Sequence, residues 1–347
     1  MSYAIARAPK LTQLGDMSHQ FAGNQELIET LTQRPRKLHT SLCYDEDGGE
    51  FFALLCKQPE YYPAHVEREL LFREGQNIAR LADPDQIVDL GSGNMEKVQI
   101  LIHEVVKNKK YLHYVPCDID ANAVRTGMWQ LMYFYDQNVK FTPVNARFED
   151  CIAWAPRTSG PRLYTFLGIT YGNLSLSERQ SLLSTLYTHM GDDDYFLLAV
   201  DLVKDRETME SAYRDSGGYL RKNILQALAT LNDQYGGVFE LEQFDHEARY
   251  EEDRRCIVEY IVSRRDQTVP IRELGIDLEL EAGERIETEF SEKFVLVDLM
   301  KELDDRGFSP AQTYMDVEMK YALLLLKRTE TPTNRGSTLF PVGRASA

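Results

Sequence analysis

A glycine turn is the first part of this chain whose residue types and spacing suit ligand chemistry. Residues 87–94 (IVDLGSGN) join a β-branched apolar run to small residues, and helix-like sequence follows from 95 to 106. Because glycine has no Cβ, the backbone of such a turn can approach a ligand closely, and the helix start beyond it offers unpaired N–H groups. A dinucleotide fingerprint would need a third glycine, which the residues after Gly93 do not supply. We therefore expect a strand, turn and helix that bind another kind of ligand, or else an ordinary structural turn.

Two polar residues follow other predicted strands. Asp118 comes about 25 residues after the glycine turn, where a carboxylate can accept both ribose hydroxyls of an adenosyl group, and Asp120 competes for this role. Asn173 closes the run 166–174 (FLGITYGNL), and its amide can donate to a carboxylate while it accepts from an amine. An asparagine that only shapes or caps a loop fits the local sequence better.

Predicted strands and helices alternate regularly from about residue 65 onward. We predict strands over 111–117, 139–144, 162–167 and 195–200, with a helix over 121–135. From 205 to 292 the alternation stops, and we expect a helix containing Tyr213, a helix over 220–232 and strands over 256–263 and 276–280. A helix over 294–305 and a strand over 321–327 then resume the pattern. Such alternation predicts a parallel sheet covered on both faces, with ligands at the carboxyl ends of its strands.

This pattern predicts an α/β protein with a Rossmann-like, doubly wound core and a second α+β domain. The core takes residues 66–204 and 293–328, whereas the second domain combines residues 1–65 with the insertion 205–292. The tail, 329–347, is rich in small and polar residues and is expected to be flexible.

Composition excludes several classes of function. A formal net charge of −16 opposes binding of nucleic acid, whose phosphates need clustered Lys and Arg. No run reaches the roughly 20 apolar residues that span a bilayer, so we expect no membrane segment. Five scattered cysteines without C-x-x-C spacing argue against a disulfide framework and a metal site. The first residues lack a secretory signal, and we expect a cytoplasmic protein, with a monomer favoured.

Six motifs in order carry a resemblance to one family. The glycine turn with its preceding Asp89 is similar to the first motif of class I S-adenosylmethionine-dependent methyltransferases. The full set, which covers roughly residues 38–327, resembles the histidine-specific Nα-methyltransferases of ergothioneine biosynthesis. The motifs are 59–63 (PEYYP), 90–93 (LGSG), 114–118 (YVPCD), 166–173 (FLGITYGN), 201–205 (DLVKD) and 287–294 (ETEFSEKF). The resemblance implies a class I methyltransferase fold, S-adenosylmethionine as cofactor, and trimethylation of the amine of L-histidine to hercynine.

The resemblance also implies a substrate site. Asn173 and Tyr213 would hold the substrate carboxylate, and Tyr44 would lie beside the amine. A carboxylate such as Glu289 can accept an imidazole N–H, and Ser291 can donate to or accept from the second ring nitrogen. The implied catalytic residues are Tyr44, Asn173 and Tyr213, and the implied substrate-binding residues are Tyr61, Gly168, Asn173, Tyr213, Glu259, Glu289 and Ser291.

The implied cofactor residues are Gly91, Ser92, Gly93, Lys97, Asp118, Arg147 and Phe148, with Phe148 against the adenine. Arg147 departs from the family pattern, which leads us to expect an acidic residue there, and Asn145 or Glu149 could take its place. Glu259 aligns with an apolar pocket residue. It could strengthen contact with a cationic ring, change the accepted amino acid, or face outward from its strand.

Two alternatives remain open at this stage. The first keeps the chemistry but changes the acceptor to another amino acid or to a tryptophan-derived alkaloid precursor, because fungal enzymes that methylate a prenylated tryptophan share the character of residues 91–98. Glu289 disfavours that branch, since an indole does not need two polar partners. The second alternative is a non-catalytic metabolite-binding relative, which the unusual Arg147 motivates.

Overall fold

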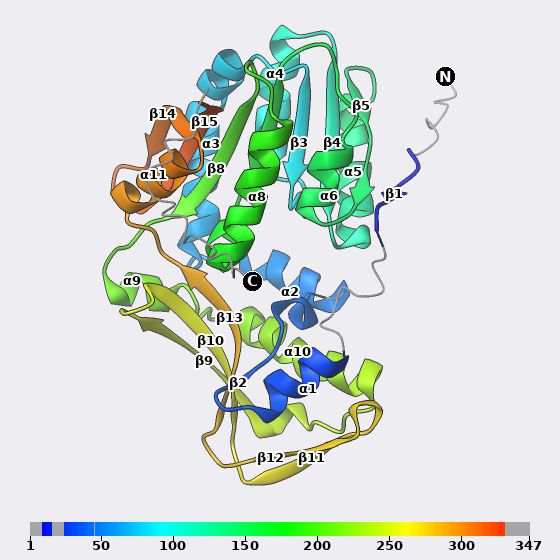
Figure 1. Ribbon diagram of the computed structural model, residues 1–347, viewed down its shortest axis with the longest axis vertical. Coiled ribbons are helices and arrows are strands. Elements are labelled where there is room, and N and C mark those ends of the chain that lie inside the picture. The colour runs from blue at the N-terminus through cyan, green and yellow to red at the C-terminus, as the bar shows by residue number, and fades with distance from the viewer. Residues whose placement is uncertain (1–8, 16–23, 45, 330–347) are drawn as a thin grey trace, which may run out of the picture.

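The computed structural model describes residues 9–15, 24–44 and 46–329. Figure 1 shows a large sheet with helices on both faces above a smaller sheet with its own helices. Except for Thr329, the tail expected to be flexible lies outside the described residues. No helix in the described ranges is long and apolar enough to cross a membrane.

The large sheet runs in the order β1-β6-β4-β3-β7-β8-β15-β14, and β5 also pairs with β4. Strands β3, β4, β7 and β8 are parallel neighbours, whereas β15 is antiparallel to both β8 and β14. This arrangement confirms the predicted doubly wound, Rossmann-like fold. The bounds are β1 (Thr12–Gln13), β3 (Gln86–Leu90), β4 (Leu112–Asp118), β5 (Val139–Phe141), β6 (Val144–Asn145), β7 (Arg162–Phe166), β8 (Tyr195–Asp201), β14 (Phe308–Met315) and β15 (Tyr321–Arg328).

Helices cover both faces of this sheet, so its central strands β3 and β7 are buried at every residue, including their few polar ones. One face packs against α3 (Tyr62–Ala82), α4 (Val98–Asn108) and α5 (Ala121–Tyr135). The other packs against α6 (Phe148–Trp154), α8 (Leu176–His189) and α11 (Leu296–Asp305). The carboxyl ends of β3, β4, β7 and β8 therefore point together toward the smaller sheet (Figure 1).

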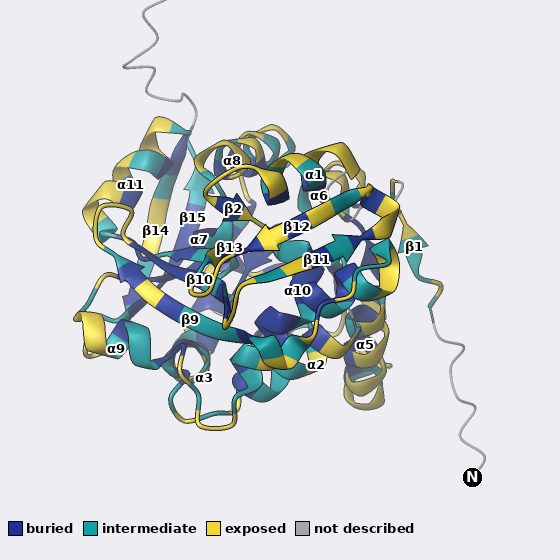
Figure 2. Cartoon of the chain, turned by 90° about the horizontal axis from the view of Figure 1, so that it is seen from below, coloured by how far each residue is buried: buried dark blue, intermediate teal, exposed yellow. Residues whose placement is uncertain are grey.

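The smaller sheet has the order β2-β13-β10-β9 and encloses a separate apolar core with α10. In Figure 2 its strands are buried or half-buried along most of their length, whereas the β11–β12 hairpin carries more exposed residues. The strands are β2 (Arg36–Lys37), β9 (Phe244–Glu251), β10 (Cys256–Ser263), β11 (Gln267–Ile271), β12 (Ile276–Leu280) and β13 (Arg285–Glu292). The remaining helices of the described chain are α1 (Asn24–Thr32), α2 (Glu46–Leu55), α7 (Thr170–Asn173), α9 (Arg206–Ser211) and α10 (Tyr219–Tyr235), with short 3₁₀ turns η2 (Thr40–Cys43), η3 (Leu241–Gln243) and η4 (Arg272–Leu274).

The chain crosses between the two parts at a few short links. Phe294 forms a parallel bridge with Leu202, so the strand β13 leads straight back into the large sheet. We propose residues 293–328 and the segment up to 204 as the methyltransferase core. Because helix α3 begins at Tyr62, we propose that the N-terminal part of the second domain ends at residue 61 instead of 65.

Several predicted element bounds were wrong. The strand expected over 139–144 is divided into β5 and β6, and Pro143 between them has no N–H to continue the ladder. The helix expected from 95 begins at Val98, because Met95 has a left-handed φ of 62°. Tyr213 was expected within a helix, but α9 ends at Ser211 and Tyr213 follows it.

Candidate active site

The glycine turn after β3 is tied to the end of β4. The N–H groups of Gly91 and Ser92 both donate to the carbonyl of Cys117, at 2.9 and 3.0 Å. Gly91 and Gly93 have φ values of 71° and 48°, which favour glycine. A Cβ on Gly93 would meet no atom of the described chain within 4 Å. The turn therefore leaves open space above its backbone.

Two further features fit this turn to an adenosyl cofactor. The buried hydroxyl of Ser92 has no hydrogen-bond partner among the described residues, so a polar group could still pair with it. Asp118 accepts hydrogen bonds from the N–H groups of Gly93 (2.9 Å) and Asp120 (3.0 Å), which hold its carboxylate beside the turn. Burial raises the pKa of Asp118. The competitor Asp120 instead caps α5.

Lys97 and Gly168 meet at the end of β7. Glu67 of α3 is fully buried and forms an ion pair with Lys97 (2.6 Å), and its other oxygen accepts the N–H of Gly168 at 2.5 Å. Tyr321 donates to the Gly168 carbonyl at 2.7 Å. Burial opposes the charge on Lys97, but Glu67 outweighs it and raises the pKa of the lysine. Glu67, which no sequence motif singled out, thus positions both predicted residues.

Phe148 and Arg147 lie at the start of α6. The Phe148 ring packs edge-on against Phe166, with centroids 4.9 Å apart, and it also faces Gly91. Arg147 precedes the helix, and its side chain is exposed. Asn145 donates to the carbonyls of Asp118 and Ile119, so its amide nitrogen supports the loop after β4. The contact of Arg147 with the cofactor stays a prediction.

A pocket between the two parts brings together most of the predicted substrate residues. Tyr44 comes from the end of η2, Asn173 from α7 and Tyr213 from the segment after α9. Gly168 lies just outside, next to the lining residue Ile169. The lining comprises Tyr44, Phe52, Leu55, Tyr61, Ile169, Asn173, Tyr213, Leu220, Glu259, Glu289 and Ser291.

Aromatic rings form one wall of the pocket. Tyr44 contacts Phe52, Phe52 contacts Tyr61, and Tyr61 contacts Tyr213, each edge to face with centroids 5.9–6.2 Å apart. Such edge-to-face pairs stabilise one another and hold each ring in a fixed direction. These contacts hold the wall rigid and give the tyrosine hydroxyl groups fixed positions.

Glu289 on β13 also lines the pocket. The amide nitrogen of Asn173 donates to its Oε1 at 2.5 Å, and the Tyr44 hydroxyl approaches Oε2 at 3.3 Å. Burial, together with the neighbouring Glu259, raises the pKa of Glu289 to about 8. Asn173 keeps its buried Oδ1 without a hydrogen-bond partner in the described chain, so this oxygen can accept one from a bound ligand.

Gly172 explains how Asn173 reaches Glu289. A Cβ on Gly172 would lie 2.6 Å from the backbone oxygen of Glu292, which is closer than real Cβ atoms approach. Only glycine therefore lets α7 lie directly against β13. This contact joins the end of β7 to the smaller sheet.

Lys293 contacts the predicted site residues Tyr213 and Ser291, but the sequence motif in which it stands did not single it out. It is fully buried, and its Nζ donates to Tyr213 (2.8 Å) and Ser291 (2.8 Å) and pairs with Asp201 (3.0 Å). Burial opposes its charge, but Tyr213 and Asp201 raise its pKa. Residues 289, 291 and 293 share one face of an extended chain, and that period of two could have indicated the lysine.

Asp201 completes this network at the end of β8. It accepts hydrogen bonds from Tyr62 (2.7 Å) and pairs with Lys204 (2.5 Å) as well as with Lys293. Burial opposes the charge on Asp201, but the two lysines outweigh it and lower the pKa of the carboxyl. The network holds Tyr213 and Ser291 in place from behind the pocket.

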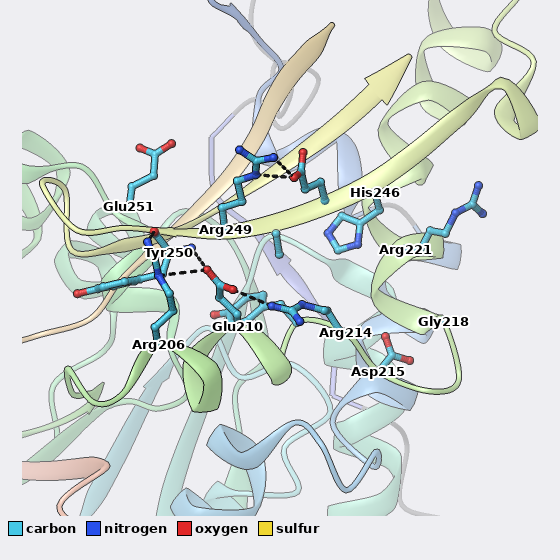
Figure 3. Close-up of a pocket in the computed structure, with 13 residues that line it drawn as sticks. Arg206, Glu210, Arg214, Asp215, Gly218, Arg221, His246, Arg249, Tyr250 and Glu251 are labelled. Atoms are coloured by element: carbon cyan, nitrogen blue, oxygen red, sulfur yellow. Dashed lines mark hydrogen bonds and ion pairs between the residues drawn. The ribbon is translucent and has the colours of Figure 1, made fainter. Parts of the chain in front are cut away.

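A larger hollow of about 860 Å³ lies beside this pocket, along β9 (Figure 3). Two of its arginines share one carboxylate: Glu210 accepts from Arg214 at 2.7 Å, and Arg206 lies 3.5 Å from it. Arg221 instead donates to the backbone carbonyl of Phe244 at 2.8 Å. Tyr213 and His246 line it, and Tyr213 also lines the inner pocket.

The known proteins that this chain resembles are methyltransferases. A family model described as histidine-specific, SAM-dependent methyltransferase matches residues 23–328. A histidine N-alpha-methyltransferase of Mycolicibacterium smegmatis is 31% identical over 298 residues, 86% of this chain and 92% of the relative. Its counterpart in Mycobacterium tuberculosis is 31% identical over 288 residues, 83% of this chain and 89% of the relative. A 4-dimethylallyltryptophan N-methyltransferase of Claviceps purpurea is 29% identical over 203 residues, 56% of this chain and 59% of the relative.

These matches favour an enzyme over a non-catalytic binding protein, and the open space and unpaired hydroxyl at the glycine turn fit the cofactor that the family model names. The chain belongs to the histidine-specific methyltransferase family and is a methyltransferase that uses S-adenosylmethionine.

Proposed function

We propose that this protein is an Nα-methyltransferase that acts on L-histidine and adds three methyl groups to yield hercynine. The observation that carries the proposal is the pocket in which Asn173, Tyr213, Glu289 and Ser291 converge. When bound, S-adenosylmethionine supplies an electrophilic methyl group. This chain matches most of the length of the two relatives named for histidine methylation, which supports histidine as the proposed substrate.

Tyr213 and Asn173 are proposed to bind the amino-acid end of the substrate. Tyr213 accepts a hydrogen bond from Lys293, so its own O–H proton is available for the substrate carboxylate. Burial raises the pKa of Tyr213 to about 12, which keeps that proton in place at neutral pH. The unpartnered Oδ1 of Asn173 can accept from the substrate amine.

Glu289 and Ser291 are proposed to bind the imidazole ring. They are two residues apart on β13 and face the same pocket. A ring with two nitrogen atoms satisfies both polar partners, whereas an indole or a phenyl ring leaves at least one unpaired. A pocket built in this way rejects such side chains strongly.

Methyl transfer itself needs a neutral amine in line with the methyl group. Positioning by Asn173, Tyr213 and Tyr44 is the contribution that we assign to the protein, because a well-oriented encounter lowers the barrier without a strong base. The Tyr44 hydroxyl lies beside Glu289, and burial raises its pKa well above the ordinary value, so it acts as a neutral group. We assign no single general base.

The test is an initial-rate panel with S-adenosylmethionine and each common amino acid, read as release of S-adenosylhomocysteine. Histidine should be preferred, and Ser291→Ala should lower the preference. Glu279→Gln, an exposed glutamate on β12, is the matched control. Preference for an aromatic amino acid such as tryptophan would refute the proposed substrate.

A further inference from the structure

Two buried glutamates face each other across neighbouring strands of the substrate pocket. Glu259 on β10 is the direct antiparallel partner of Glu289 on β13, so both side chains lie on the same face of the sheet. They are 3% and 5% exposed, and both line the pocket. Glu259 therefore faces inward, which excludes the alternative that it points outward from its strand.

Separate partners hold the two carboxylates. His246 on β9 contacts Glu259 Oε2 through its Nε2 at 3.0 Å, whereas Asn173 and Tyr44 hold Glu289. The two acidic groups are thus presented to one space from two sides.

A buried pair of like charges is unfavourable for folding alone. Glutamates directly opposite each other repel, and burial increases the repulsion. The nearest lysine, Lys293, already donates to Tyr213 and Ser291 and pairs with Asp201. A proton on one carboxyl relieves the repulsion when the pocket is empty, in agreement with the raised pKa of Glu289. A positively charged ligand would relieve it more fully.

We propose that Glu259 is a specificity-determining residue which, together with Glu289, selects an amino acid whose side chain is a cation with N–H donors, here the imidazolium form of histidine. This inference rests on the proposed function and deepens it. Glu289 accepts an N–H of the bound ring while Glu259 faces the same pocket, and the ring's positive charge replaces the proton that the pair would otherwise keep. His246 acts as a positioning residue, because it orients Glu259 from the side of the hollow on β9.

The experiment compares two ligands of the same shape. Calorimetry on the full chain measures the Kd of L-histidine and of L-1,2,4-triazolylalanine, whose ring stays neutral, at pH 6, where much of the free imidazole is protonated. The wild type should bind histidine about tenfold or more tightly, which is the range of a charge-assisted hydrogen bond. Glu259→Gln and Glu259→Met should reduce this preference to about threefold or less, whereas Glu279→Gln should keep it.

The outcomes separate the inference from the proposed function. Gln is an isostere that can keep the contact with His246, so a folded Glu259→Gln protein with an unchanged preference would overturn the role of Glu259 even if histidine is methylated. If the wild type methylates lysine or arginine but not histidine, the proposed substrate fails and selection of a cation stands. Methylation of a neutral aromatic amino acid in preference to histidine would overturn both.

Discussion

At the scale of single residues, the acidic pair in the pocket has a consequence for stability. Burial raises the pKa of Glu289 to about 8, above the value of an unfolded glutamate near 4.3. Between these values the folded chain holds a proton that the unfolded chain has lost. Stability must therefore fall as pH rises from about 4.5 to about 8.

Glu289→Gln should remove this dependence, because the amide does not titrate. We expect the wild type to lose roughly 1–3 kcal/mol more of its unfolding free energy than the variant between pH 5.5 and pH 8. Urea unfolding without ligand at both pH values measures the difference, with Glu279→Gln as a control on the surface. Parallel curves for wild type and Glu289→Gln would show that this carboxyl is not protonated in the folded protein.

Tyr213 offers a second prediction at this scale. Tyr213→Phe removes the hydroxyl that accepts from Lys293 and is proposed to donate to the substrate carboxylate. The affinity for histidine should fall by about 1.5–3 kcal/mol, the range for a hydrogen bond to a charged group. Calorimetry provides the affinity. Tyr219→Phe is a suitable control, since Tyr219 lies on α10 outside the pocket lining, and equal losses in both variants would refute the role.

At the scale of elements, the close contact between α7 and β13 is what joins the two parts of the site. Gly172→Ala would place a Cβ 2.6 Å from a backbone oxygen, which has no flexible side chain to yield. We expect a loss of about 1–3 kcal/mol in stability, as for other overpacked sites. The KM for histidine should rise as well, because Asn173 would move away from Glu289.

Gly75→Ala on α3 is the matched control for this prediction. Its Cβ would meet Ile100 at 3.5 Å, an ordinary contact, and alanine favours a helix interior by about 0.5–1 kcal/mol. The control should therefore unfold at an equal or higher temperature, with an unchanged KM. A Gly172→Ala protein that behaves in the same way would mean that α7 can shift without effect.

The elements of the large sheet could be predicted because burial on both faces leaves an unambiguous pattern. The strands β3, β7 and β15 are mostly apolar, and the helix predicted over 121–135 coincides with α5. Strand β9 escaped prediction because charged residues interrupt it: Asp245, His246 and Glu247 follow one another. The alternation of buried and more exposed residues along β9 can be recognised only when its partner strand β10 is known.

The site was less accessible to sequence reasoning. Tyr44, Asn173 and Glu289 are distant along the chain, and only the resemblance to a family grouped them. Their convergence depends on the contact at Gly172 and on the pairing of β10 with β13. Glu67 and Asp201 act from behind the site. Glu67 has no local signal, because a buried ionisable residue looks like a surface residue until its partner is placed, whereas Asp201 stands in the motif 201–205, which does not reveal its buried lysine partners.

At the scale of the whole molecule, ligand binding at the glycine turn should stabilise the fold. S-adenosylhomocysteine at 100 times its Kd should add about 2.7 kcal/mol and raise the melting temperature accordingly. Gly93→Val should abolish this rise, because φ at Gly93 is 48° and a β-branched side chain would also fill the open space.

Gly283→Val is the control for this prediction. Gly283 also has a positive φ, 82°, and open space around its Cβ position, but it lies in the turn between β12 and β13. Both variants should be less stable than the wild type, and only Gly93→Val should lose the response to the ligand. An equal response in the two variants would place the cofactor elsewhere.

The central claim is that a pocket with two polar partners for an imidazole delivers the amine of histidine for repeated methylation. The most direct measurement follows the mass of the histidine product together with the S-adenosylhomocysteine released, at completion and with excess S-adenosylmethionine. We expect histidine carrying three added methyl groups on its α-nitrogen and three S-adenosylhomocysteine molecules per histidine consumed. Histidine of unchanged mass, with methyl groups on another amino acid in the same mixture, would contradict it.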